Sequence, residues 1–237
     1  MGGRAAVLLS GGIDSTVALH LACRNHGNEF VIGMSVHYGQ RHKKEIEFAD
    51  KTCAQLGVQR KVINLDSVIP PTMLTDDTRE VPNISYSDIV GTSPTYVPFR
   101  NGLMLSAAAS AFHGGLQNGE FGEPTSVQNA GEHSLYYGAH AEDAQGWAYP
   151  DCTPEFNGAM ANAIFIGTYQ QVRLCTPLQW LTKGDIILLG ERLGVAWDST
   201  WSCYKGGELH CGVCPTCRAR RAGFQLVGVT DPTEYAA

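Results

Sequence analysis

The 237-residue sequence lacks the features of a membrane protein, a secreted protein or a protein that coats nucleic acid. No apolar stretch approaches the ~20 residues that a membrane-spanning helix requires. Met1-Gly2-Gly3-Arg4 leads straight into an apolar run, so we expect no signal peptide and a cytoplasmic location. The net charge of −6 argues against a broad nucleic-acid-binding surface, which needs an excess of lysine and arginine. We therefore expect small-molecule partners, with no membrane and no direct nucleic-acid contact.

Charged residues are also scarce, at 17% of the chain against 43% hydrophobic residues, a balance typical of a globular protein with a sizeable core. The sequence contains no internal repeat and no low-complexity tract. It predicts an α/β domain over residues 1–198 and a C-terminal subdomain over residues 199–237. The local basic cluster Arg218-Ala219-Arg220-Arg221 is expected to form a solvated face.

Eight cysteines are present, and their distribution is uneven. Cys23, Cys53, Cys152 and Cys175 are scattered, whereas the other four lie within fifteen residues near the C-terminus. A disulfide scaffold is expected in a shorter, secreted chain, so the clustering favours metal binding in a reducing compartment.

The clustered cysteines follow the pattern Cys203-x7-Cys211-x2-Cys214-x2-Cys217, which suits a tetrahedral zinc ion. Four thiolates leave no open position for water, so we predict a closed structural Zn²⁺ site. An iron–sulfur cluster also uses four cysteines, whereas a redox Cys-x-x-Cys needs only two. A nucleic-acid-binding zinc module is disfavoured by the few basic residues nearby. His210 is a further candidate ligand, although the adjacent Cys211 makes it redundant.

Strand-like and helix-like segments alternate along the chain, which predicts a doubly wound, mainly parallel sheet. The strands are expected at residues 5–9, 30–36, 61–65, 135–138 and 172–175, and the helices at residues 15–26, 42–56, 102–113, 154–169 and 183–193. Asn101, Thr153 and Thr182 are the expected helix caps. Residues 66–99 carry five prolines and are expected to form a lid or pocket wall, and residues 114–134 a polar insertion. Parallel sheets bind ligands beyond the carboxyl ends of their strands, so the segments after strands one, two and four should share one cleft.

The loop after the first strand carries the clearest chemical signal. Its sequence, Ser10-Gly11-Gly12-Ile13-Asp14-Ser15-Thr16, places two glycines and small polar residues where a helix begins. Unpaired N–H groups and the positive end of the helix dipole gather there, so the loop predicts an anion site for phosphate. The Lys-Ser/Thr ending of the kinase-type phosphate loop is absent from the whole chain, which excludes that type.

The loop resembles the pyrophosphate loop of the N-type ATP pyrophosphatases, and the chain as a whole resembles the 7-cyano-7-deazaguanine synthases within that superfamily. Beyond the loop, the resemblance is carried by His37-Tyr38-Gly39-Gln40-Arg41-His42 with Glu45, by Thr95-Tyr96-Val97-Pro98-Phe99-Arg100-Asn101-Gly102, by Tyr149-Pro150-Asp151-Cys152-Thr153-Pro154-Glu155-Phe156, and by Thr200 to Gly207 continuing through the cysteine cluster to Ala222-Gly223-Phe224 and Asp231-Pro232-Thr233-Glu234-Tyr235. The insertion at residues 114–134 is longer than the family usually carries. We expect it to border the cleft on the side of strand four.

The resemblance implies an adenine nucleotide α-hydrolase-like fold and an ATP-dependent enzyme. Its expected reaction joins 7-carboxy-7-deazaguanine and ammonia into 7-cyano-7-deazaguanine (preQ0), through an adenylated carboxylate and an amide, in queuosine-type deazapurine biosynthesis. ATP, Mg²⁺ and Zn²⁺ are the implied cofactors, and a homodimer is the implied assembly. Gly2 stands where a fused glutaminase would need cysteine, so free ammonia is the expected nitrogen source.

The implied site residues fall into three groups. The ATP-binding group is Ser10, Gly11, Gly12, Ile13, Asp14, Ser15, Thr16, Met34 and Val36, the last two beside adenine. Asp14, Arg100 and Lys205 are the expected catalytic residues. The base-binding group is Tyr38, Gln40, Arg41, Phe99, Arg100, Asn101, Asp143, Glu155 and Phe156. His37, His42 and His140 lie near strand ends and are candidate proton carriers, none of them assigned individually.

Three rival functions stay open at this point. A variant that halts at the amide needs the same loop and the same carboxylate pocket. A tRNA-modifying thiolase needs a persulfide-bearing cysteine, for which Cys152 is the suitably placed candidate. A zinc-containing binding module on a degenerate nucleotide fold requires a loop that no longer binds phosphate. The intact Ser-Gly-Gly-x-Asp-Ser motif disfavours this function.

Overall fold

The computed structural model describes residues 3–41, 43–66, 68–76, 78–85, 88, 91–122 and 133–237. His42 and residues 123–132 lie outside this part of the chain, so the expectation for His42 and the central part of the predicted insertion are not addressed by the structure. Among the described residues, no helix combines the length and the apolar composition that crossing a bilayer requires.

Five parallel strands form one sheet in the order β3-β2-β1-β4-β5. The strands are β1 (Ala5–Leu8), β2 (Val31–His37), β3 (Gln59–Asn64), β4 (His133–Tyr136) and β5 (Val172–Cys175). The chain builds outward from β1 to β3 on one side and then returns to place β4 on the other side. Such a reversal defines the switch point of a doubly wound sheet. The predicted fold class is confirmed.

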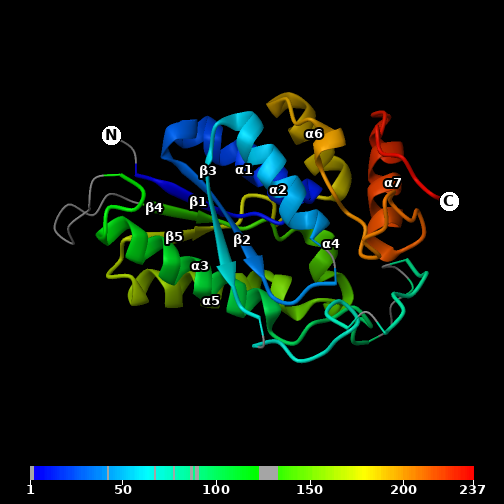
Figure 1. Ribbon diagram of the computed structural model, residues 1–237, viewed down its shortest axis with the longest axis horizontal. Helices are drawn as coiled ribbons and strands as arrows, with labels where there is room; N and C mark the ends of the chain where they lie inside the picture. Colours follow the sequence, from blue (N-terminus) through cyan, green and yellow to red (C-terminus); the bar gives the residue numbers. More distant parts are fainter. Residues whose placement is uncertain are drawn as a thin grey trace.

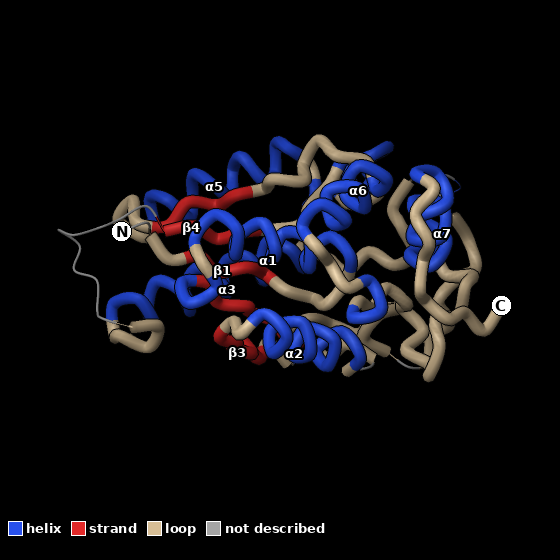
Figure 2. The backbone as a smooth tube through the Cα atoms, turned by 90° about the horizontal axis from the view of Figure 1, so that it is seen from above, coloured by secondary structure: helices blue, strands red, loops and turns tan. Residues whose placement is uncertain are grey.

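Helices cover both faces of the sheet, as Figures 1 and 2 show. The longer helices are α1 (Ile13–His26), α2 (Lys44–Leu56), α3 (Arg100–Gln117), α5 (Pro154–Gly167), α6 (Lys183–Leu193) and α7 (Pro215–Val227). Because successive strand residues point to opposite faces, Ala6 and Leu8 pack with α3, whereas Ala5 and Val7 pack with α1 and α6. The short helical turns are Asn28–Phe30, α4 (Ala141–Ala144), Gln145–Trp147, Pro150–Cys152 and Trp197–Ser199.

The helix α3 begins earlier than predicted, and Asn101 is not its cap. Phe99 precedes the helix in a left-handed conformation with φ of 52° and makes no capping bond through its side chain. The carboxylate of Asp151 instead accepts a hydrogen bond from the Asn101 N–H at 3.1 Å. A capping group fifty residues away in the sequence replaced the local one, and that is why the local pattern misplaced the start.

The other two expected caps are confirmed. The Thr153 hydroxyl accepts the N–H of Phe156 at the start of α5. Thr182 and Asp185 form a reciprocal capping box at the start of α6. The helices α4 and α7 were not predicted.

The predicted insertion at residues 114–134 is shorter than expected. Helix α3 continues to Gln117, and β4 begins at His133. The described residues between them turn back on the amino edge of the sheet, where the Phe121 ring lies 6.0 Å from that of Phe112 and Lys61 pairs with Glu120. A helix-to-strand connection must reach the start of the next parallel strand, so its described flanks lie opposite the carboxyl ends. The expectation that they border the cleft is wrong.

Residues 66–99 contain no α-helix and no strand of the sheet among their described positions. Four of these residues, Ile69, Leu74, Val81 and Val97, are buried in the hydrophobic cluster shared with α3. The hydroxyls of Ser93 and Thr95 bond to that of Tyr149 at 3.1 and 2.6 Å. None of the described residues in this stretch lines the main cavity, so the expectation of a pocket wall is wrong for them.

The C-terminal segment packs directly against the α/β layers. The Trp201 N–H donates to the Gly11 carbonyl at 2.8 Å, and α7 lies against α6. Arg220 is 1% exposed, pairs with Asp231 at 3.1 Å and donates to the Thr200 hydroxyl at 2.7 Å. The expectation of a solvated face therefore holds for Arg218 and Arg221 but is wrong for Arg220. A buried arginine needs partners, and residues flanking the cysteine cluster supply them.

Candidate active site

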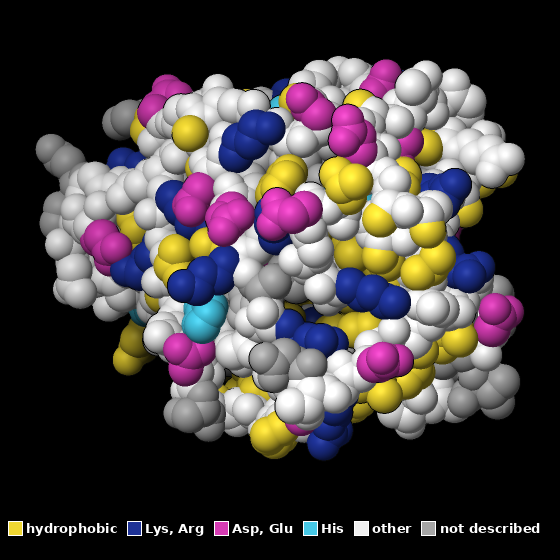
Figure 3. All heavy atoms as spheres, turned by 45° about the vertical axis from the view of Figure 1, so that its right-hand side comes forward, with side chains coloured by type: hydrophobic (Ala, Val, Ile, Leu, Met, Phe, Trp, Pro, Cys, Tyr) yellow, Lys and Arg dark blue, Asp and Glu magenta, His cyan; other side chains and the backbone are white. Residues whose placement is uncertain are grey.

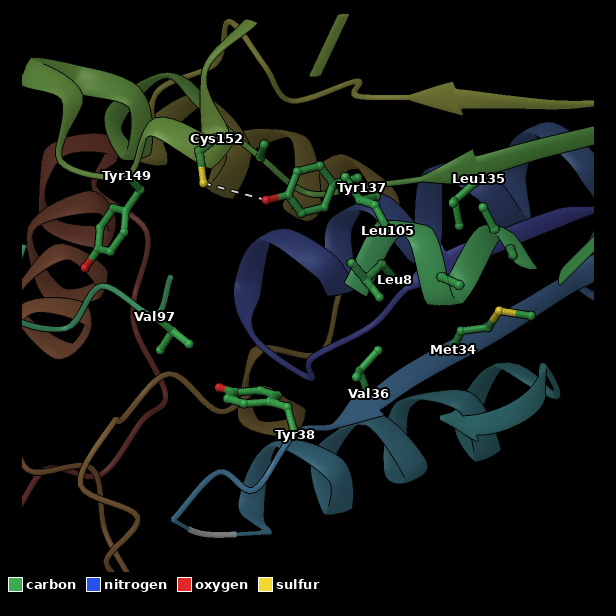
Figure 4. Packing of buried hydrophobic residues seen from close by; sticks show 14 of the residues in the cluster. Leu8, Met34, Val36, Tyr38, Val97, Leu105, Leu135, Tyr137, Tyr149 and Cys152 are labelled. Atoms are coloured by element: carbon green, nitrogen blue, oxygen red, sulfur yellow. Dashed lines mark hydrogen bonds between the residues drawn. The ribbon is translucent and has the colours of Figure 1, made fainter. Parts of the chain in front are cut away.

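A cavity of about 220 Å³ opens at the carboxyl ends of the strands. It is lined by residues that follow β1, β2 and β4, including Ser10, Tyr38 and His140. Trp201 and Tyr204 close it from the C-terminal segment. Figure 4 shows Tyr38 just after the end of β2 and Tyr137 just after the end of β4, and both residues line this space. The predicted shared cleft is confirmed.

The loop of residues 10–16 has a shape set by its own side chains and by α2. Gly11 has φ of +79°, and a Cβ there would lie 2.5 Å from the Glu45 carbonyl oxygen, so only glycine fits. The Ser15 hydroxyl accepts the Ser10 N–H and donates to the Gly12 carbonyl, both at 3.2 Å. Most of the loop lines the cavity; Gly11 and Thr16 do not. The start of α1 therefore points its unpaired N–H groups at the cavity.

An acid–base cluster of Asp14, His140, Asp143 and Lys183 lies beside this loop. The Lys183 ammonium is 2.6 Å from Asp14 Oδ1 and 3.0 Å from His140 Nε2. His140 Nε2 is in turn 3.2 Å from Asp143 Oδ2. Three elements thus bring their charges together: the start of α1, the segment around α4 and the first residue of α6.

The two carboxylates of the cluster are tuned in opposite directions. Burial alone would raise the pKa of Asp14, but the nearby Lys183 and His140 outweigh it and hold that pKa below its ordinary value. For Asp143, burial is the dominant cause and raises the pKa, although His140 and Lys183 act against it. Asp14 is consequently the carboxylate that stays charged most readily.

Lys183 is the candidate site residue that the sequence pattern did not indicate. The capping box placed it correctly in the first turn of α6, but that local signal carries no information about what the side chain reaches. The loop of residues 10–16 contains no lysine, so a cation that neutralises a bound anion has to come from another element. The fold brings Lys183 from 169 residues away.

A second group of residues, here called the Arg100 wall, comprises Tyr38, Glu45, Arg100 and Tyr204, all lining the cavity. The Arg100 guanidinium lies 5.6 Å from the Tyr38 ring centroid and donates to the Tyr38 hydroxyl at 3.4 Å. Its buried Nε has no hydrogen-bond partner among the described residues. Burial would lower the pKa of Arg100, but Tyr38, Tyr204 and Glu45 hold it well above its usual value. The guanidinium therefore remains charged and has a donor to spare.

Five predicted site residues lie away from the cavity. Lys205 is exposed and donates to the Asn83 side chain at 2.8 Å, and Glu155 is exposed in the first turn of α5. Phe99 and Phe156 pack edge to face at 5.8 Å, outside the cavity lining. Arg41 donates to the carbonyls of Met73 and Arg79. Each belongs to a motif of which other residues line the cavity, but its own side chain is not part of that lining.

The remaining predicted residues are divided between core and cavity. Met34 is fully buried in the hydrophobic cluster, whereas its neighbour Val36 lines the cavity. Gln40 and Asn101 also line it. His37 pairs with Asp66 at 2.6 Å and does not line the cavity.

Cys152 is a buried thiol at the cavity rather than a reactive one. Its Sγ lies 3.3 Å from Asn101 Nδ2 and 3.6 Å from the Tyr137 hydroxyl, which points at it in Figure 4. Burial, reinforced by Asp143 and Asp151, raises the pKa of Cys152 well above its usual value. Since the thiolate is the nucleophilic form, this environment suppresses reactivity.

The four clustered cysteines form a candidate metal centre. The sulfurs of Cys203, Cys211, Cys214 and Cys217 all lie within 4.8 Å of one another. Backbone N–H groups point at the sulfurs of Cys203 and Cys211 at 3.3–3.4 Å, as expected for groups that stabilise thiolates. The set fits a four-coordinate ion with no open position.

His210 does not belong to this ligand set. Its Nε2 accepts the Ser202 N–H at 3.0 Å, and its ring lies 4.2 Å from the Trp201 ring. Burial, together with Arg220, lowers the pKa of His210 to about 4, so the ring is neutral and acts as an acceptor. The expectation that Cys211 makes it redundant agrees with this geometry.

Comparison with known proteins identifies a family that the sequence matches. The model of the family described as queuosine biosynthesis protein QueC matches residues 4–228. The 7-cyano-7-deazaguanine synthase of Thermoplasma acidophilum is 41% identical over 98% of this chain and 92% of its own length. That of Caldicellulosiruptor saccharolyticus is 42% identical over 98% and 95%. Among solved structures, an NMN synthetase from Francisella tularensis matches with a TM-score of 0.46 and 16% identity, covering 97% of this chain and 79% of that one.

Proposed function

The chain belongs to the queuosine biosynthesis protein QueC family, and we propose that it makes 7-cyano-7-deazaguanine from 7-carboxy-7-deazaguanine, ammonia and ATP. The observation that carries the proposal is the match over nearly the whole chain to relatives with that synthase name. The cavity supports it chemically, because an anion-binding loop and a charged arginine with a free donor line the same space.

The loop of residues 10–16 and the acid–base cluster are proposed to hold the phosphates of ATP. The N–H groups at the start of α1 bind the β- and γ-phosphates. The Lys183 ammonium neutralises phosphate charge, which is the role of the loop lysine in a kinase-type phosphate loop. Lys183 must then exchange part of its contact with Asp14 for phosphate oxygens. Backbone at Ser35 and Val36, which line the cavity, is proposed to contact adenine.

The Arg100 wall is proposed to bind the acid. Arg100 binds the substrate carboxylate and presents one of its oxygens to the α-phosphorus of ATP. Formation of that P–O bond expels pyrophosphate and leaves an acyl adenylate. Ammonia then attacks the carbonyl carbon, AMP leaves, and the amide forms. A second adenylation on the amide oxygen, with loss of a proton, lets elimination of AMP give the nitrile.

Two metal ions fit the residues present. Mg²⁺ bound to ATP would neutralise phosphate charge, and the carboxylates of Asp14 and Asp143 would supply it with oxygen ligands by exchanging their contacts with Lys183 and His140. Zn²⁺ fits the four-sulfur set, where it would act structurally by holding the start of α7 against the cavity wall formed by Trp201 and Tyr204.

Thiolation is disfavoured by the environment of Cys152. A persulfide-bearing cysteine has to be reachable as a thiolate, whereas this thiol is 6% exposed and its pKa is raised by burial. On the face shown in Figure 3, lysine and arginine side chains alternate with acidic ones and form no continuous basic field for tRNA. We therefore retain small molecules as the proposed partners.

We also propose that the chain is divided into an α/β domain of residues 1–198 and a C-terminal subdomain of residues 199–237. The proposed assembly is a homodimer, and the proposed location is the cytoplasm. Ile166 and Tyr169, at the end of α5, are 65% and 70% exposed, and such apolar side chains are suited to a contact between copies. Sedimentation velocity of the purified protein tests the assembly.

The activity test is incubation of the purified protein with 7-carboxy-7-deazaguanine, ammonium and Mg-ATP, followed by mass spectrometry. The nitrile with AMP and pyrophosphate is the expected outcome, and the amide alone would indicate a variant that halts halfway. Asp14→Ala should abolish AMP formation without changing the zinc content measured by elemental analysis. Formation of ADP, or AMP formation that survives Asp14→Ala, would contradict the assignment of the loop.

A further inference from the structure

One carboxylate in the cavity has no role in the steps above. Glu45 lies in the first turn of α2 and lines the cavity together with Arg100 and Tyr38. Its backbone is fixed, because the Glu45 carbonyl packs against Gly11 of the loop. Among the described residues its carboxylate makes no hydrogen bond, and its electrostatic partner is the Arg100 guanidinium. Burial raises the pKa of Glu45, and Arg100 only partly offsets that rise.

The other carboxylates of the cavity are committed elsewhere. Asp14 pairs with Lys183, and Asp143 pairs with His140, so both belong to the acid–base cluster beside the loop. Glu142 accepts the Lys183 N–H at 2.9 Å. Glu155, which the sequence suggested for the base, is exposed outside the cavity. Glu45 is thus the carboxylate of the cavity that is left to receive a neutral donor from a ligand.

The ligand group that Glu45 receives has to donate hydrogen bonds to its carboxylate. An adenine edge offers one donor beside one acceptor, which suits backbone groups better than a carboxylate. A 2-amino-pyrimidinone edge, as in guanine, offers two adjacent N–H donors, which a carboxylate accepts bidentately. A ribose diol also donates twice, but it belongs to ATP rather than to the acid. The neighbouring Arg100 and Tyr38 favour the base, because one binds its carboxylate and the other offers an aromatic face.

We propose that Glu45 accepts the N1–H and 2-amino donors of the substrate base and is the residue that selects a guanine-type base. This inference rests on the proposed function for the identity of the acid. Arg100 and Glu45 then hold the same molecule from two sides, and the carboxyl group of the base is oriented toward the α-phosphorus. Glu45 acts in recognition and takes no proton in the reaction.

Calorimetric titration of the intact, zinc-loaded protein tests the proposal. The two probes are 7-carboxy-7-deazaguanine and its analogue without the 2-amino group. The wild type should bind the analogue about 10- to 100-fold more weakly, as expected for loss of half of a bidentate contact. Glu45→Gln should weaken binding of the full base by a similar factor, and it should then distinguish the two probes by less than threefold. Glu47→Gln, two residues further on and on the exposed side of α2, is the matched control and should behave like the wild type.

The outcomes separate this inference from the proposed function. Glu45-dependent binding of the base without AMP formation would overturn the proposed reaction and leave the recognition role intact. Unchanged base binding with weakened binding of Mg-ATP in Glu45→Gln would overturn the inference and assign Glu45 to the ribose. Equal discrimination between the two probes by wild type and Glu45→Gln would also overturn it. Circular dichroism and zinc content of each variant exclude misfolding as the cause.

Discussion

The two sides of the cavity differ in whether their charged groups already have hydrogen-bond partners within the protein. In the acid–base cluster, every charged group already has a partner, since Lys183 contacts both Asp14 and His140, and His140 contacts Asp143. In the Arg100 wall, Arg100 Nε and the Glu45 carboxylate have no hydrogen-bond partner among the described residues. The first side is organised before any ligand arrives and has to exchange contacts. The second side keeps groups that a ligand can bind, and under the proposed function it is the side that selects the substrate.

The largest effect is expected from breaking the organised side. Lys183→Met should lower kcat for AMP formation by about 10²–10³-fold, because one positioned charge opposite developing negative charge has roughly that value. The measurement is pyrophosphate release under saturating substrates. Lys205→Met is the control, since Lys205 is exposed and bonded to Asn83, and it should retain near wild-type kcat. The reverse ranking of the two lysines would contradict the placement of the phosphates.

A smaller effect, on binding rather than turnover, is expected from the open side. Arg100→Lys keeps the charge but loses the planar fork, so KM for the acid should rise about 10- to 100-fold. KM for ATP should change by less than twofold, because the loop and Lys183 are untouched. Arg218→Lys on the exposed face of α7 is the control. A parallel rise in both KM values would show that Arg100 serves ATP instead.

Asp143 is expected to affect the stability of the folded protein in a pH-dependent way. Its pKa is raised in the folded protein, mainly by burial, so its charge opposes folding at neutral pH, and that opposition fades as pH falls toward the ordinary value of 3.8. Asp143→Asn should therefore raise Tm at pH 7, with about 2–4 °C for each kcal/mol relieved. The difference from wild type should shrink between pH 7 and pH 4. Thermal unfolding followed by circular dichroism at several pH values measures it.

The charge of Asp14 is expected to have the opposite effect on stability. Its pKa is lowered, so its charge contributes stability that is present above 3.8 and is lost as pH falls through the lower folded-state value. Asp14→Asn should reduce Tm at pH 7, since it leaves the Lys183 ammonium without its closest partner. Equal shifts of Tm in the two variants would mean that the cluster does not separate the two carboxylates.

The smallest effect concerns the cap that supports Lys183. Thr182→Ala removes the hydroxyl of the capping box and should cost about 1 kcal/mol of stability. Because α6 remains packed against α1 and α7, kcat should fall by less than threefold. Thr153→Ala, at the cap of α5, should cost a similar stability with no change in kcat. A loss of kcat as large as that of Lys183→Met would show that the cap alone positions the lysine.

The sequence determined the features whose physics is local. The apolar run Ala5–Leu8, the glycine-rich loop with its left-handed Gly11, the two threonine caps and the cysteine spacing each depend on neighbours only a few residues away. Alternating strands and helices sufficed for the doubly wound sheet, because parallel strands need crossover helices. The cleft position followed, since strand carboxyl ends meet at one edge.

The tertiary structure alone decided which charges meet. Lys183 reaches Asp14 across 169 residues, Asp151 caps α3 in place of Asn101, and Arg220 is buried on Asp231 instead of solvated. Tertiary packing also decides that Lys205 and Glu155 lie outside the cavity lining and that Glu45 belongs to it. Side-chain direction at the end of a motif depends on how the chain turns next, and that turn is fixed by packing against distant elements. Local patterns therefore predicted an anion-binding loop, and only the fold showed which lysine and which carboxylate line the same cavity.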